Sequence, residues 1–110
     1  MNLTCSVSFA DDVATIIPVG DIDVDSTSKL RDVLQLAAVR PGITSVMVDL
    51  GGVTFMDSSA LGVLVAARRN AETRGASFGV RNPGPMVTMV LQITGLYDDL
   101  VTEKADLADA

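Results

Sequence analysis

The amino-acid sequence predicts a small α/β domain, and three observations support this. Apolar β-branched runs alternate with segments of helical periodicity, and residues 45–80 follow the order strand, helix, strand that is typical of a parallel crossover. The 110 residues are 48% hydrophobic and only 4% aromatic, which is enough aliphatic material for one core. We therefore expect a single domain over residues 1–110, with a mixed β-sheet of four to five strands and about four α-helices packed on it.

The first third of the chain predicts two strands followed by a helix. Leu3–Phe9 and Val13–Val19 are rich in β-branched residues and lie close together, which favours a hairpin, and Gly20 is expected to end the second strand. Ser26-Thr27-Ser28 offers N-caps for a helix that stops at Pro41-Gly42. The side chains expected to point inward from this helix are Leu30, Val33, Leu34 and Ala37.

The middle of the chain predicts a buried strand that leads into a second helix. Val46–Leu50 is nearly continuous in apolar residues, as expected for a strand covered on both faces. Gly51-Gly52 and the short apolar run Val53–Met56 follow, and Asp57-Ser58-Ser59 then supplies N-cap chemistry. The helix is therefore expected to begin close to Ser58 or Ser59 and to end before Gly75.

The last third predicts a strand, a helix and a short edge strand. Ala76–Val80 is the expected parallel neighbour of the central strand. Met86, Met89, Val90 and Ile93 recur at helical spacing, so we expect a third helix, closed by Gly95. Its two methionines are expected to pack in the core, in preference to the alternative of an adaptable partner surface. Leu100–Thr102 is expected to add an edge strand, and the tail 104–110 to form a short helix or a frayed end.

Composition excludes several function classes. The net charge of −6 argues against direct nucleic-acid binding, which depends on clustered Lys and Arg. The single cysteine, Cys5, has no partner for a disulfide and no His or second Cys for a metal site, so neither a metal nor a cofactor is expected. The start of the chain has no leader pattern and no apolar run is long enough to span a bilayer, so we expect a cytoplasmic protein.

Besides capping the helix, the Asp57-Ser58-Ser59 cluster offers hydroxyl groups that can be modified chemically. The first-turn amide groups of a helix lack intrahelical acceptors and the helix dipole is positive there, so a phosphate on either hydroxyl would meet hydrogen-bond donors. Capping is nevertheless the ordinary role of serine at this position. Asp57 either caps the helix, the more frequent role, or orients a serine hydroxyl.

Two motifs resemble those of a known family. DLGGVTFMDSSALGVLV, from Asp49 to Val65, resembles the signature of STAS domains, specifically the stand-alone anti-sigma factor antagonists of bacteria. GDIDVDSTSKL, from Gly20 to Leu30, is similar to the family's second motif. The motifs lie in the right order, and the chain length matches one such domain. The family commonly has Gly where this chain has Ala60.

This resemblance implies a regulatory function. An anti-sigma factor antagonist binds, when unphosphorylated, an anti-sigma factor that is also a serine kinase with bound ATP, and thereby releases a sigma factor. The resemblance places the phosphorylated serine at Ser59, with Ser58 as the cap or, if the helix start shifts by one residue, as the alternative acceptor. It implies a partner-binding surface that contains Asp23, Asp57, Ser58 and Ser59.

Two other functions are less well supported by the residues. A serine hydrolase would need a base, but the chain has no His, its only lysines are Lys29 and Lys104, and the G-x-S-x-G and Walker motifs are absent, so we do not expect an enzyme. A phosphorylation-independent STAS regulatory subunit of a transporter or a stress-signalling complex is the main alternative. We expect a monomer or a weak dimer.

Overall fold

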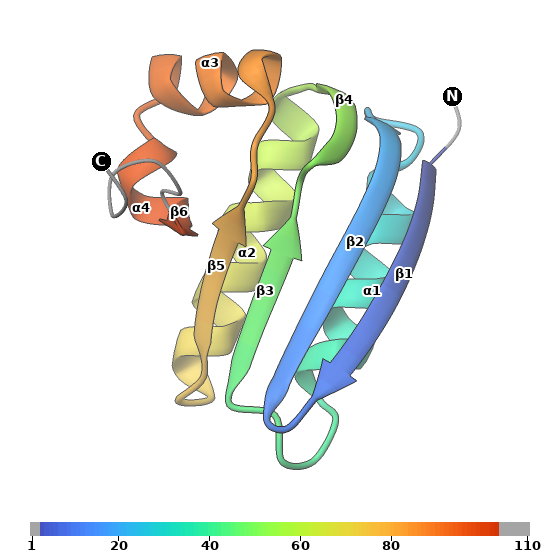
Figure 1. Cartoon of the computed structure of the whole chain (residues 1–110), viewed down its shortest axis with the longest axis vertical. Coiled ribbons are helices and arrows are strands. Elements are labelled where there is room, and N and C mark those ends of the chain that lie inside the picture. Colours follow the sequence, from blue (N-terminus) through green and yellow to red (C-terminus); the bar gives the residue numbers. More distant parts are fainter. Residues whose placement is uncertain (1–2, 104–110) are drawn as a thin grey trace.

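The computed structural model describes residues 3–103, which form one mixed β-sheet with helices packed on it (Figure 1). The strands are β1 (Leu3–Ala10), β2 (Val13–Ile22), β3 (Ser45–Asp49), β4 (Gly52–Met56), β5 (Ser77–Arg81) and β6 (Val101–Glu103). The helices are α1 (Thr27–Ala38), α2 (Ser58–Thr73), α3 (Pro85–Ile93) and α4 (Tyr97–Leu100). The predicted α/β fold is confirmed; the tail 104–110 lies outside the described residues.

The sheet has the order β1-β2-β3-β5-β6, and β4 pairs with β2 beyond the end of β3. β1 and β2 form the predicted antiparallel hairpin, whereas β2, β3, β5 and β6 pair in parallel. Two parallel connections, β2-α1-β3 and β3-α2-β5, place α1 and α2 on the same face of the sheet (Figure 1). The predicted crossover is therefore confirmed.

The core lies between the sheet and the helices α1 and α2. Alternate residues of the three central strands face the helices and are buried, because successive side chains of a strand point to opposite faces. These strand residues are Ala14, Ile16, Val46, Val48, Phe78 and Val80, and the helices contribute Leu30, Leu34, Leu61 and Leu64. No helix within residues 3–103 is long and apolar enough to cross a bilayer.

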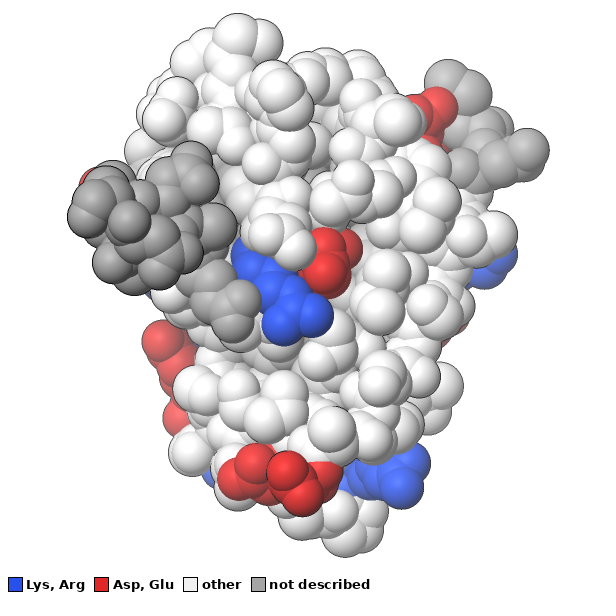
Figure 2. All heavy atoms as spheres, viewed as in Figure 1, with Lys and Arg blue, Asp and Glu red and all other residues white. Residues whose placement is uncertain are grey.

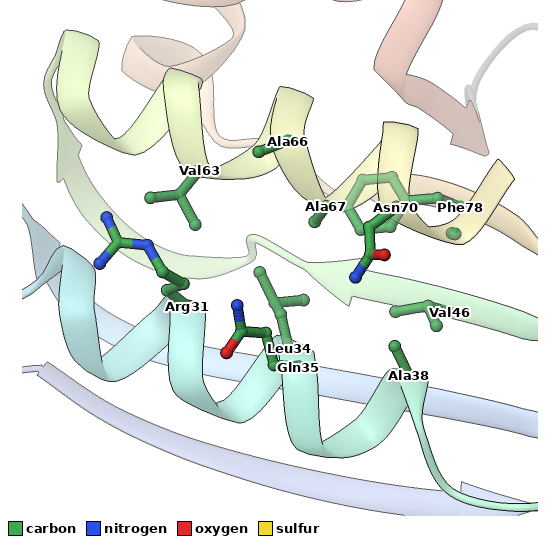
Figure 3. A pocket seen from close by; sticks show the side chains of 11 residues that line it. Arg31, Leu34, Gln35, Ala38, Val46, Val63, Ala66, Ala67, Asn70 and Phe78 are labelled. Carbon is green, nitrogen blue, oxygen red and sulfur yellow. The ribbon is translucent and has the colours of Figure 1, made fainter. Parts of the chain in front are cut away.

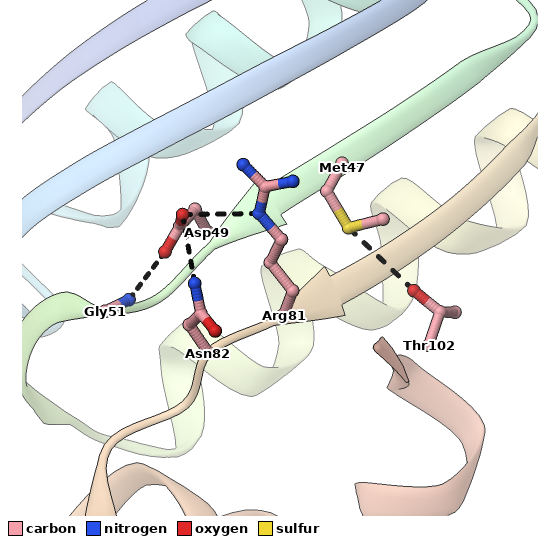
Figure 4. Close-up of polar contacts among 6 residues, drawn as sticks. All are labelled: Met47, Asp49, Gly51, Arg81, Asn82 and Thr102. Carbon is pink, nitrogen blue, oxygen red and sulfur yellow. Dashed lines mark hydrogen bonds and ion pairs between the residues drawn. The ribbon is translucent and has the colours of Figure 1, made fainter. Parts of the chain in front are cut away.

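Among residues 3–103, the opposite face of the sheet carries no long helix, and Figure 2 shows few charged side chains on it. Asp49 at the end of β3 accepts hydrogen bonds from Arg81 Nε (3.3 Å) and Asn82 Nδ2 (3.4 Å) through Oδ2, and from the Gly51 N–H (2.9 Å) through Oδ1 (Figure 4). These contacts join the ends of β3 and β5 and fix the chain where it bends toward β4.

Strand β2 is longer than predicted. Gly20 was expected to end it, but the chain passes Gly20 at a positive φ of 118°, with a register shift between Gly20 and Asp21, and continues to Ile22. The prediction was wrong because glycine accepts this bulge without steric cost. The extension provides a pairing edge for residues 52–56, so the apolar run after Gly51-Gly52 becomes β4, a strand that the sequence analysis did not anticipate.

The buried face of α3 also differs from the prediction. Val87 and Leu91 are buried, whereas Met86, Met89 and Ile93 are exposed, so the expectation that both methionines pack in the core was wrong. The sequence pattern does not distinguish the two faces, because Val87 and Leu91 are four residues apart and Met86 and Met89 are three apart, and both spacings fit one face of a helix. The packing of α3 against β4, a strand absent from the prediction, determines which set is buried.

The close approach of β6 to Gly79 generates a prediction. A Cβ at Gly79 would lie 2.2 Å from Thr102 Oγ1 and 2.6 Å from Thr102 Cγ2, so Gly79→Ala must displace β6. We expect it to lower the free energy of unfolding by about 1–3 kcal/mol in urea titrations. Adding Thr102→Ala, which removes both atoms, should restore part of the loss; strictly additive effects would contradict this account.

Candidate functional site

Asp57 is the N-cap of α2. Its backbone is extended (φ −107°, ψ −176°), and its carboxylate accepts hydrogen bonds from the backbone N–H groups of Ser59 (3.0 Å) and Ala60 (3.3 Å). α2 therefore begins at Ser58, as predicted, but the cap is Asp57 and not Ser58. The carboxylate satisfies two of the amide groups that a helix leaves without intrahelical acceptors.

Asp57 also orients the hydroxyl of Ser59. Ser59 Oγ donates a hydrogen bond to Asp57 Oδ1, the same oxygen that accepts from the two amides. Ser59 is half-buried, whereas Ser58 is exposed. The two roles considered for Asp57 are therefore filled together, and the two serines occupy different environments.

The charge of Asp57 is stabilised by its surroundings. The Ser59 hydroxyl is the largest influence and lowers the pKa of Asp57; burial opposes this, and the backbone N–H groups of Ala60, Ser59 and Val24 lower the pKa further. The carboxylate is thus ionised at neutral pH. It offers a strong acceptor beside the Ser59 hydroxyl.

The loop that contains Asp23 lies next to this helix start. The Asp57 N–H donates to the carbonyl oxygen of Ile22 (3.2 Å), and the Val24 N–H contributes to the lowered pKa of Asp57. The fold thus brings residues 22–24 and 57–59 together, although more than 30 residues separate them. The Val24 side chain is 71% exposed beside them.

Asp23 itself shapes the loop. Its Oδ1 accepts hydrogen bonds from the backbone N–H groups of Asp25 and Ser26 and from the Ser26 hydroxyl, each at 3.1 Å. The side chain of Asp21 points toward β4 instead, where its Oδ1 accepts a hydrogen bond from Thr54 Oγ1 (2.7 Å) that joins β2 to β4. Asp23 therefore determines how Val24 is presented beside α2.

The methyl group of Ala60 does not obstruct Ser59. Ala60 is 0% exposed, so its methyl group points into the core. A glycine at this position would therefore open no additional path to the Ser59 hydroxyl from solvent.

A groove between α1 and α2 was not anticipated from the sequence (Figure 3). It has a volume of about 340 Å³ and lies over Leu34, Val46 and Phe78. It exists because small residues of α2, Ala66 and Ala67, face α1 along its length. Neither Asp57 nor either serine lines it, so it is separate from the start of α2.

The lowered pKa of Asp57 predicts a pH-dependent contribution to stability. Because the pKa is lower in the folded state, the contribution is complete above the unfolded pKa, near 3.8, and is lost as the pH falls through the lower folded value. Asp57→Asn should retain capping but lose this pH dependence, and Asp57→Ala should cost about 0.5–2 kcal/mol at neutral pH. Urea titrations between acid and neutral pH measure both effects.

The exposed neighbour Ser58 provides the control for this prediction. Ser58→Ala leaves the capping carboxylate in place, so we expect a change within about 0.5 kcal/mol at every pH. If Ser58→Ala were as destabilising as Asp57→Ala, the assignment of Asp57 as the cap would be wrong.

Comparison with known proteins agrees with this architecture. The family model described as "Mlab, STAS domain" matches residues 5–102. The anti-sigma-B factor antagonist of Listeria monocytogenes is 30% identical over 99 residues, which cover 89% of this chain and 86% of that protein.

Solved structures show the same fold. An anti-sigma factor antagonist from Mycobacterium paratuberculosis has a TM-score of 0.82 at 24% identity, covering 98% of this chain and 90% of that one. SpoIIAA, an anti-sigma factor antagonist, has a TM-score of 0.78 in its unphosphorylated form (21% identity; 96% and 93% covered) and 0.70 in its phosphorylated form (20%; 96% of each). The chain belongs to the STAS domain family, within which it is similar to the anti-sigma factor antagonists.

Proposed function

We propose that this protein is an anti-sigma factor antagonist that works as a phosphorylation switch. The unmodified protein binds an anti-sigma factor that is also an ATP-dependent serine kinase, and a sigma factor is released. Phosphorylation of Ser59 by that kinase ends the binding. The protein itself supplies a binding surface and a phosphate acceptor, and catalyses no reaction.

One observation carries this proposal: the Ser59 hydroxyl is hydrogen-bonded to the Asp57 carboxylate at the first turn of α2. A carboxylate that accepts from a serine hydroxyl fixes its orientation toward an incoming phosphate donor. The first-turn position places the product phosphate near the positive end of the helix dipole. Family membership, and the existence of a phosphorylated form of SpoIIAA, whose fold this chain shares, are consistent with a phosphorylation switch.

The same contact explains how a phosphate would act. Phosphorylation replaces the hydroxyl proton, so the hydrogen bond from Ser59 Oγ to Asp57 is lost, and a charge of about −1.5 to −2 is placed beside an ionised carboxylate. Asp57 must then move away or share its amide donors with the phosphate. Either change alters the surface that the partner contacts.

The surroundings of Ser59 suit a protein partner. Val24 on the neighbouring loop and Phe55, near the end of β4 that leads into α2, are exposed apolar side chains, and Asp23 fixes the loop that carries Val24. A partner that covers such side chains also desolvates the serine. A phosphate left unpaired in that interface would cost about 2–5 kcal/mol, or roughly 30-fold to several thousand-fold in affinity.

Substitutions at Ser59 test the switch. Ser59→Asp should weaken binding to the partner kinase by about 30-fold or more, because it places a second carboxylate beside Asp57. Ser59→Ala should bind nearly as well as the original protein, since Asp57 still caps α2 through backbone amides. Titration calorimetry measures both affinities, and equal values for the two variants would refute the switch.

Phosphate transfer tests the acceptor directly. The protein is incubated with ATP and each anti-sigma kinase of its host, and modified peptides are mapped by mass spectrometry. We expect phosphate on Ser59 that is absent in Ser59→Ala and retained in Ser58→Ala, the matched control. A kinase that binds but transfers no phosphate would favour the phosphorylation-independent STAS module instead.

Ala60→Gly tests whether the departure from the family pattern matters. Because the methyl group is buried, we expect no faster phosphorylation of Ser59, but a loss of about 1 kcal/mol in unfolding free energy from the backbone entropy of glycine and the lost packing. A substantially higher transfer rate at unchanged stability would show that the methyl group hinders the kinase.

A further inference from the structure

Strand β1 is an edge strand whose own residues lack the features that usually prevent edge-to-edge pairing. It is the first strand in the sheet order and pairs only with β2 among the described strands (Figure 1). Its eight residues, LTCSVSFA, include no charge and no proline. Natural edge strands are commonly protected by lysine, proline, bulges or shortness, so a long uncharged edge of this kind favours strand addition.

The register shows which backbone groups are available at this edge. The carbonyl of Asp12, the residue before β2, accepts hydrogen bonds from the Thr44 and Ser45 N–H groups. The backbone N–H and C=O groups of the even-numbered residues of β2 therefore point toward β3. These even-numbered residues of β2 are opposite odd-numbered residues of β1. In such a non-hydrogen-bonded antiparallel pair the backbone groups of both residues point away from each other, so those of the odd-numbered β1 residues point away from β2. The Leu3 carbonyl, which accepts from Lys29 Nζ, fits this pattern. Cys5, Val7 and Phe9 thus direct their N–H and C=O groups outward.

Exposed apolar side chains lie along the same edge. Val7 and Phe9 on β1 flank a shallow groove of about 380 Å³ with Val33 and Leu36 of α1. Leu36 is 71% exposed and Val39 is 53% exposed. Strand pairing at β1 would bring a second apolar surface against this groove, so backbone and side chains favour the same mode of association.

We propose that two copies of this chain associate through antiparallel pairing of their β1 strands about a two-fold axis at Val7. In this register Val7 is opposite Val7 of the second copy, and Cys5 is opposite Phe9. The outward groups of these three residues then bond reciprocally, as an isologous interface requires. A two-fold axis at Cys5 would place Leu3 opposite Val7 and would need the Leu3 carbonyl, which already accepts a hydrogen bond from Lys29.

Asp32 on α1 and Arg40, just after its end, carry complementary charges in this arrangement. Lys29 lies beside Leu3 and Arg40 stacks on Phe9, 3.9 Å from the ring centroid, so α1 runs alongside β1 in the same direction. With rises of about 1.5 Å per helix residue and 3.3 Å per strand residue, Leu36 is roughly level with Val7 and the two-fold axis. Arg40 of each copy is then level with Asp32 of the other, and Leu36 is level with Leu36.

The proposed interface leaves the start of α2 accessible. Asp57 is held by the Ile22 carbonyl at the end of β2, Ser59 is hydrogen-bonded to Asp57, and neither lines the groove beside β1. The association is therefore independent of the proposed phosphorylation switch. One strand and one helix from each copy form a small interface, in the class below about 1,200 Å², so a weak, concentration-dependent dimer is expected.

Sedimentation velocity over a concentration series tests the proposal, with Val7→Lys as the disrupting variant. Lysines opposite each other on the axis should weaken self-association about tenfold or more. Val19→Lys is the matched control, because Val19 is exposed on β2 but points to the other face of the sheet. Circular dichroism verifies that both variants fold. A monomer at every concentration, or a dimer insensitive to Val7→Lys, would overturn the proposal.

Disulfide trapping tests the register. In a Cys5→Ser background, Val7→Cys places two thiols opposite each other, with Cα atoms about 5.5 Å apart, within the disulfide range of about 4.4–6.8 Å. Mild oxidation should give a covalent dimer with Val7→Cys and none with Val19→Cys. Equal cross-linking of the two variants would indicate random collision and would refute the proposed axis.

Discussion

The length of β2 is the constraint on which the rest of the structure depends. Its first half pairs with β3 and its second half with β4, because the chain passes Gly20 through a bulge and continues to Ile22. The Ile22 carbonyl then accepts the Asp57 N–H, which holds the start of α2 at the end of the sheet. If β2 ended at Gly20, β4 would lose its pairing at Phe55 and Met56, and the Asp57 N–H would lose its acceptor at the start of α2.

The site that results is a small polar network under electrostatic control. One carboxylate oxygen of Asp57 accepts from two backbone amides and from the Ser59 hydroxyl, and this keeps its pKa low. Stability and the proposed function therefore share one group. The cap holds the helix start in place, and the same charge makes a phosphate on the neighbouring residue disruptive, since two anions then compete for the same donors.

Three surfaces of the molecule differ in chemical character. The start of α2 and the Asp23–Val24 loop form a polar site with an apolar margin, the outer edge of β1 carries backbone groups and aliphatic side chains, and the groove between α1 and α2 is apolar with a polar rim. The proposed association uses β1 and α1, whereas the proposed partner surface uses the start of α2 and the loop after β2, so both can occur on the same molecule.

The sequence by itself determined the features that depend on neighbouring residues. It predicted the strand before Asp49, a helix start close to Ser58 or Ser59, and the glycines Gly75 and Gly95 that close α2 and α3 at positive φ, because capping and turn chemistry act over a few residues. Only the tertiary structure decided that residues 52–56 are a strand and that Met86 and Met89 are exposed. It also decided that Val24 lies beside Asp57. Each of these features depends on which distant segment provides a pairing edge or a packing surface. The residues near each feature do not determine that segment, so it could not be predicted from them.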